Sequence, residues 1–181
     1  MQGNIRDSLF RPELLKRIVI YGLMTLILGS AQCSFFPILK ICPRTPDLIM
    51  GMLLAVMLID SEKSAAVLAL CAGFFIDAIG GGAITLSPVI YLLFVLFIGI
   101  FSHKMLTSFA SFCILMLPAL LYRAAATWIC LLISYGSALG LGALWEIIIP
   151  ELLCTALLSL PLYAIVKLCT ASLETHSRFT F

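Results

Sequence analysis

The sequence predicts an all-α membrane protein with about six transmembrane helices. Of its 181 residues, 62% are hydrophobic and 11% are charged, whereas soluble domains carry about 25% charged residues. Long apolar runs alternate with short polar segments, and the basic residues gather on one side of the resulting topology. A soluble protein of this size could not bury so much apolar surface, so the sequence indicates a bilayer as its solvent.

The apolar runs define the order of the elements. A basic N-terminal segment, 1–17, precedes a single polytopic membrane domain, 18–168, and a polar tail, 169–181, follows it. We interpret six runs as spans: 18–36, 47–59, 65–79, 86–101, 105–135 and 147–168.

The first run is long enough to cross a membrane, which takes about 20 residues. It ends in a faint lipoprotein-like pattern, but Gln32 stands just before Cys33, where a small residue is needed. We therefore expect a retained helix rather than a cleaved signal. The second run opens as a helix would: Thr45 can cap it, Pro46 suits the first helical position, and Asp47 favours the positive end of the helix dipole.

The later runs differ in length. The second and third are short for a hydrocarbon core of about 30 Å, so either neighbours bury their ends or the bilayer thins locally. The fifth is too long for one upright helix, so it tilts, kinks at Pro118 or lies partly in the interface. Gly29, Gly51 and Gly99 are predicted helix-packing positions.

The distribution of basic residues predicts the topology. With a cytoplasmic N terminus, six spans place eight basic residues inside and two outside: Arg6, Arg11, Lys16, Arg17, Lys63, Lys104, Lys167 and Arg178 against Lys40 and Arg44. This positive-inside bias puts both termini in the cytoplasm.

A stripe of small residues ending in an acid marks the third run. Ala69, Gly73 and Asp77 are four residues apart and share one helix face, and a glycine turn, 80–82, follows them. Small residues let a neighbouring backbone approach closely. An ionisable residue in a membrane helix indicates a function or a specific partner.

Asp77 has two open interpretations. It either snorkels to water at the outer end of its helix or pairs with Arg123, which lies within the fifth run towards the same side. Glu146 and Glu151, at the start of the sixth run, are the other candidate partners of Arg123. A proton or ion pathway would use the same residues, but it needs polar groups at several depths, which the sequence lacks.

Several other functions find no support in the sequence. The only histidines, His103 and His176, are far apart, so no metal-ligand spacing exists, and no cofactor motif is present. The turn at Gly80 and Gly81 lacks the lysine and hydroxyl residue of a phosphate-binding loop. No arrangement of nucleophile and base is evident, and a net charge of +2 does not indicate nucleic-acid binding. Cys33 and Cys42 flank a predicted external loop, where they either pair or stay reduced.

The combination and order of these features resembles the rod shape-determining protein MreD family over residues 18–167. Gln32 at the outer end of the first span, Pro46 and Asp47 at the entry to the second, and Gly73, Asp77 and Gly81 in the third carry the likeness. The final span with Pro161 is also similar. Departures lie at Ala69, where the family often has glycine, and at Ile84-Thr85, where it often has a leucine-glycine pair.

The resemblance implies a non-enzymatic component of the cell-elongation complex in the bacterial inner membrane. It implies a partner, the single-span protein MreC, and an assembly with the actin-like MreB, the glycosyltransferase RodA and its transpeptidase partner, which together direct lateral peptidoglycan synthesis and rod shape. The implied fold is similar to substrate-binding subunits of energy-coupling-factor transporters.

On this basis, we expect the outer end around Asp77, the glycine turn and Arg123 to form a platform for MreC. The main alternative is a substrate-binding subunit of a vitamin transporter, which would have similar length and hydropathy. Short loops that are poor in vitamin-gripping side chains argue against that alternative. An intramembrane enzyme comes third, for lack of a nucleophile or metal set.

Overall fold

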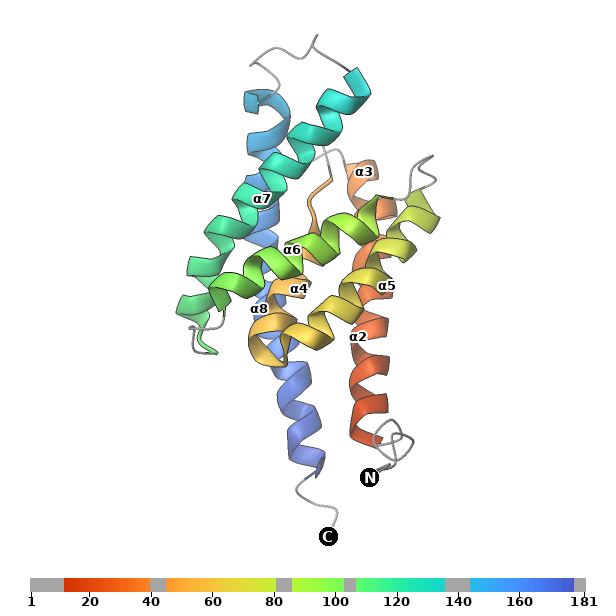
Figure 1. The fold of residues 1–181 in the computed structure, drawn as a ribbon. Helices are drawn as coiled ribbons and strands as arrows, with labels where there is room; N and C mark the ends of the chain where they lie inside the picture. Colours follow the sequence, from red (N-terminus) through yellow and green to blue (C-terminus); the bar gives the residue numbers. More distant parts are fainter. Residues whose placement is uncertain (1–11, 40–44, 81–85, 103–106, 136–143, 178–181) are drawn as a thin grey trace, which may run out of the picture.

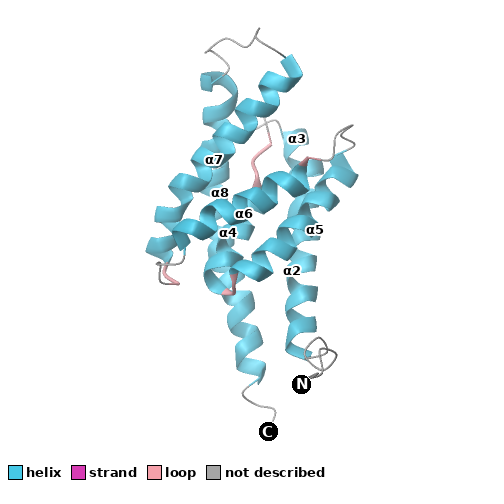
Figure 2. Cartoon of the chain, viewed as in Figure 1, coloured by secondary structure: helices cyan, strands magenta, loops and turns pink. Residues whose placement is uncertain are grey.

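The fold is a bundle of α-helices, seen in a computed structural model that describes residues 12–39, 45–80, 86–102, 107–135 and 144–177 (Figures 1 and 2). In chain order the elements are α2 (Pro12–Ser30), the π-helical turn η1 (Ala31–Phe35), α3 (Phe36–Leu39), α4 (Leu48–Ile59), α5 (Glu62–Gly80), α6 (Ser87–Ser102), α7 (Phe109–Tyr135), the π-helical turn η3 (Leu144–Ile148) and α8 (Ile149–Ser177). The expected all-α class is confirmed.

Within the described part of the chain, three helical segments are long and apolar enough to cross a membrane, namely Lys16–Ile38, Phe109–Ile133 and Glu146–Ala171. Their outward faces carry apolar side chains, as lipid contact requires: Leu121, Leu157 and Leu168 are each 71% exposed. α4 and α6 are apolar but shorter. These features fit a helical membrane protein.

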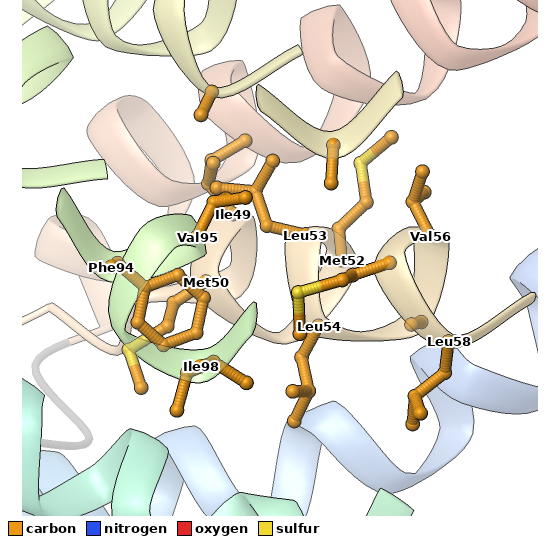
Figure 3. Close-up of a cluster of buried hydrophobic side chains, with 14 of the residues drawn as sticks. Ile49, Met50, Met52, Leu53, Leu54, Val56, Leu58, Phe94, Val95 and Ile98 are labelled. Atoms are coloured by element: carbon orange, nitrogen blue, oxygen red, sulfur yellow. The ribbon is translucent and has the colours of Figure 1, made fainter. Parts of the chain in front are cut away.

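α4 is the centre of the bundle. Every residue from Leu48 to Leu58 is buried, and twelve residues of helix extend only about 18 Å. Its side chains meet α6 at Phe94, Val95 and Ile98 (Figure 3). Of the two explanations for the short second run, burial by neighbouring helices is the one that the structure favours, because protein surrounds α4 on every side.

Contacts at the two ends of α2 and α4 show that these helices run in opposite directions. Arg17 near the start of α2 pairs with Asp60 at the end of α4, and Gln32 in η1 contacts Leu48 at the start of α4. The start of α2 and the end of α8 lie at the same end of the bundle, while α5 and α6 cross it obliquely (Figure 1).

Glycines sit where helices approach most closely. A Cβ added at Gly73 on α5 would lie 2.3 Å from Cα of Pro88 on α6, and one at Gly51 on α4 would lie 2.3 Å from Oγ of Ser159 on α8. At Gly29 it would lie 2.9 Å from the Phe75 ring. The predicted packing role of Gly29 and Gly51 is therefore confirmed, and Gly99 likewise faces the side chain of Glu62.

Some element boundaries differ from the sequence prediction. The fifth run forms one continuous helix, α7, with Pro118 inside it. α8 contains Pro161 and continues to Ser177, well into the segment predicted as a polar tail. The loop predicted after residue 36 begins later, because α3 continues the helical course to Leu39.

Candidate functional site

The candidate site is a buried polar cluster at the start of α4. Part of it consists of backbone amides of α4 and the side chains that accept their hydrogen bonds. Asp47, not Thr45, caps α4: its Oδ1 accepts a hydrogen bond from the amide of Met50 at 3.1 Å, and the helix begins at Leu48 rather than at Pro46. The predicted capping register was therefore wrong by two residues. The amide of Leu48 donates to Oε1 of Gln32 at 3.1 Å.

A third amide of this segment finds its partner on α8. The amide of Asp47 itself donates to Oγ1 of Thr155 at 3.0 Å. A helix begins with amides that have no intrahelical acceptor, and inside a membrane protein no bulk water replaces them. The side chains of Gln32, Asp47 and Thr155 therefore make it possible for α4 to begin in the interior.

The π-helical turn η1 places Gln32 for this contact. Gln32 is the buried residue of that turn and is 6% exposed. A π turn takes in an extra residue and so rotates the following side chains relative to a regular α-helix. The turn thereby directs the amide group of Gln32 inward, towards α4.

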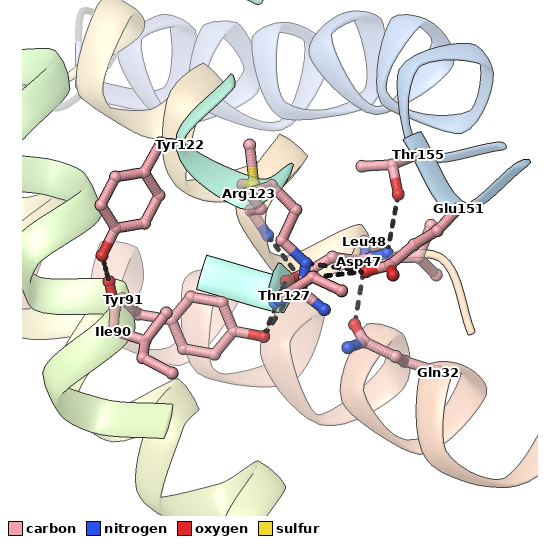
Figure 4. A network of polar contacts seen from close by, with 11 residues as sticks. Gln32, Asp47, Leu48, Ile90, Tyr91, Tyr122, Arg123, Thr127, Glu151 and Thr155 are labelled. Carbon is pink, nitrogen blue, oxygen red and sulfur yellow. Dashed lines mark hydrogen bonds and ion pairs between the residues drawn. The ribbon is translucent and has the colours of Figure 1, made fainter. Parts of the chain in front are cut away.

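Three charged side chains meet at this point (Figure 4). Nη1 of Arg123 on α7 lies 2.9 Å from Oδ2 of Asp47, and its Nε donates to Oε1 of Glu151 on α8 at 2.9 Å. The Asp47 side chain is 0% exposed and that of Glu151 1%. One guanidinium group therefore joins two buried carboxylates.

Hydroxyl groups complete the cluster. The Tyr91 hydroxyl on α6 donates to the Asp47 carboxylate, 3.0 Å from Oδ1 and 3.2 Å from Oδ2. Thr127, one helical turn after Arg123, donates to Oε1 of Glu151 at 3.4 Å. The cluster thus connects η1, α4, α6, α7 and α8 through polar groups that are costly to leave unpaired.

Next to the cluster, α6 and α7 are joined by aromatic contacts. The hydroxyl of Tyr122 donates to the carbonyl of Ile90 at 2.7 Å (Figure 4). Its ring packs on Phe94 and Phe97, with centroid distances of 5.6 and 5.7 Å. These contacts fix the backbone on either side of Arg123 and Tyr91.

The structure resolves the open question about Arg123 and Asp77. Arg123 does have an acidic partner among the three candidates, Glu151, and also Asp47. Asp77 is engaged elsewhere: its Oδ2 accepts a hydrogen bond at 3.2 Å from the amide of Ser87, the first residue of α6. Among the described contacts, Asp77 therefore caps a helix and does not pair with Arg123.

The stripe of small residues faces a neighbouring helix of the same chain. Ala69 is fully buried, and Gly73 and Asp77 both meet the start of α6. Gly80 ends α5, and Gly81 lies outside the described residues. The stripe thus serves the packing of α5 on α6, where the sequence left a separate partner open.

Sequence reasoning missed most of the cluster. It named Asp47 as a helix-start residue and as part of the MreD resemblance, not as a partner of Arg123, and gave no role to Tyr91, Thr127 or Thr155. One signal was available: Thr127 follows Arg123 by four residues, and Glu151, Thr155 and Ser159 are also four apart. Each set forms one polar stripe on an otherwise apolar helix, which indicates an interhelical contact.

Among the described residues, no group of three or more histidine, cysteine, aspartate or glutamate side chains could hold a metal ion. Ser159, buried against Gly51, donates its hydroxyl hydrogen to the carbonyl of Thr155 at 2.6 Å. The arrangement of charges and hydroxyls is suited to holding helices in register.

One disulfide lies near the same end of α8. Cys154 is disulfide-bonded, whereas Cys33 is a free thiol. Cys42, the partner that the sequence offered for Cys33, lies outside the described residues.

Comparison with known proteins gives no family assignment. No protein-family model, no curated protein and no solved structure matches this chain. The likeness to MreD thus rests on the residues that carry it.

Proposed function

We propose that this chain is a non-enzymatic, multi-pass scaffold of the bacterial inner membrane, similar to MreD, that binds MreC within the cell-elongation complex. One observation carries the proposal. Four of the residues that carry the resemblance, Gln32, Asp47, Gly73 and Asp77, each hold a junction between helices. Residues that hold helices together fix the arrangement of the bundle, and a scaffold protein acts through that arrangement.

The proposal includes six crossings with both termini in the cytoplasm. The positive-inside bias supports this orientation, as does the position of the first and last helix ends on one side of the bundle (Figure 1). In this orientation the start of α8 faces the periplasm, where disulfides persist. The bonded Cys154 therefore lies at the end where such a bond is favourable.

We place the MreC-binding surface at the outer ends of α5 and α6. Apolar side chains there point away from the bundle: Phe74 is 62%, Ile79 42%, Leu86 40% and Val89 52% exposed. Asp77 stands between Phe74 and Ile79 in the sequence of α5, and its half-buried carboxylate, whose Oδ2 accepts the Ser87 amide, offers the charge for recognition. Arg123 is no longer part of this surface, because its side chain is held in the buried cluster.

The first test is co-purification of the tagged chain from native membranes, followed by mass spectrometry of its proteins and small molecules. Recovery of MreC together with cell-wall synthases, and of no stoichiometric vitamin or other water-soluble small molecule, is the expected result. Recovery of an ATPase module or a bound vitamin would overturn the proposal in favour of transport.

The second test locates the surface. Asp77→Asn removes the charge but keeps an oxygen that can accept the Ser87 amide, whereas Asp77→Lys removes both. We expect Asp77→Asn to lower MreC recovery several-fold at an unchanged unfolding temperature. If Asp77→Asn recovers as much MreC as the unchanged chain, then the binding surface lies elsewhere.

A further inference from the structure

A cavity of about 490 Å³ lies where α2 and α5 begin, away from the buried polar cluster. Its lining changes character along the two helices. Arg17, Asp60 and Lys63 line it near the helix starts, and Ile18, Val67 and Cys71 are among the apolar residues that line it further along. A cavity with one charged end and apolar walls matches the shape of an amphiphile.

The charged end favours an anion. Arg17 and Lys63 are cations, and Asp60, which pairs with Arg17, is the one carboxylate among the lining residues. The neighbouring Glu62 is not a lining residue, and its side chain is directed towards Gly99 on α6. Together with the positive end of the α5 dipole, the lining therefore presents a net positive charge.

Hydroxyl groups also stand at the charged end of the cavity. Tyr21 lines the cavity, is 5% exposed, and has its hydroxyl group beside the Asp60 carboxylate. The nearby hydroxyl of Ser61 contacts that of Ser64 at 2.9 Å at the start of α5. Together with the charges, these hydroxyl groups make this end of the cavity polar.

The apolar end is open to the surroundings of the bundle. Ile18 and Val67 line the cavity, and each is 65% exposed. Gly22 also lines it, and a Cβ added there would meet nothing within 4 Å. Because these walls belong to membrane-facing helices, the open space is continuous with the region that acyl chains occupy.

We propose that this cavity binds one anionic phospholipid. Its phosphate lies at Arg17 and Lys63, and an acyl chain lies along Gly22, Ile18 and Val67. The charge selects the anionic headgroup, and the apolar walls distinguish a lipid from a soluble phosphate. The site is independent of MreC binding, so either proposal can fail without the other.

The test is native mass spectrometry of the delipidated protein after addition of phosphatidylglycerol or phosphatidylcholine with the same acyl chains. We expect at least tenfold preferential retention of phosphatidylglycerol. Lys63→Gln should lower that retention several-fold, and Gly22→Leu should abolish it by filling the open space beside the Gly22 Cα. Lys167→Gln removes an exposed lysine outside the cavity and should leave retention unchanged.

Four results would overturn the proposal. Equal retention of both lipids would show that headgroup charge does not contribute to binding. Unchanged retention of phosphatidylglycerol in Gly22→Leu would show that the lipid binds outside this cavity. A photo-crosslinker at position 22 that captures a protein helix rather than lipid would assign the cavity to a protein partner. Displacement of the lipid by glycerol 3-phosphate at equal concentration would likewise contradict an acyl-chain site.

Discussion

Arg123 on α7 and Asp47 at the start of α4 form a buried ion pair, with Nη1 and Oδ2 2.9 Å apart. The same guanidinium group binds Glu151 on α8. Interior charges are stable only when they are paired and hydrogen-bonded. The positions of α4, α7 and α8 are therefore mutually dependent.

Replacing Arg123 with methionine should strongly destabilise the protein, because two carboxylates would stay buried without their cation. Breaking a buried ion pair from one side costs about 3–5 kcal/mol. Denaturant unfolding in detergent micelles measures the loss, with Lys16→Met at an exposed position as the control. A change below about 1 kcal/mol would show that the cluster does not hold the helices together.

Removing the Tyr91 hydroxyl should cost more than removing that of Tyr122. Tyr91 donates to the charged Asp47, whereas Tyr122 donates to a neutral carbonyl. Hydrogen bonds to charged groups contribute about 1.5–3 kcal/mol and neutral ones about 0.5–1.5. Tyr91→Phe and Tyr122→Phe, compared by the same unfolding measurement, test this order. Equal losses would contradict a stronger hydrogen bond at the Asp47 carboxylate.

Gly73→Ala should push α5 and α6 apart. The added Cβ would lie 2.3 Å from the Pro88 backbone, a contact that a side-chain rotation cannot relieve. We expect a lower thermal unfolding midpoint. Gly22→Ala is the matched control, because its Cβ meets nothing and alanine favours a helix by about 1 kcal/mol over glycine. Similar midpoints for both variants would contradict the observed packing.

Gln32→Leu should loosen the start of α4 in particular. The variant keeps much of the side-chain volume but leaves the Leu48 amide without its acceptor, which costs about 1–3 kcal/mol. Hydrogen exchange at the first amides of α4 should accelerate relative to the end of the helix. Thr170→Val, which removes a hydroxyl bonded within its own helix, should leave α4 unchanged. Uniform acceleration along α4 would indicate global rather than local opening.

Local patterns were enough to predict the class of fold and several contacts. Glycines in apolar helices indicated close packing, and a guanidinium group within a span required an acidic partner. The identity of that partner was only partly predictable. Glu151 was among the candidates because it shares a depth with Arg123, whereas Asp47 was assigned to the start of the second span and not to Arg123.

The sequence by itself determined what must be buried or paired. Composition implied a lipid solvent, and the energetic cost of charge in that solvent implied ion pairs. Only the tertiary structure decided which groups meet. Asp77 binds the amide of Ser87 and Asp47 binds Arg123, because the crossing of α5 on α6 and the central position of α4 bring those atoms together. Spacing along one helix identifies a face, but it does not identify the helix that packs against that face.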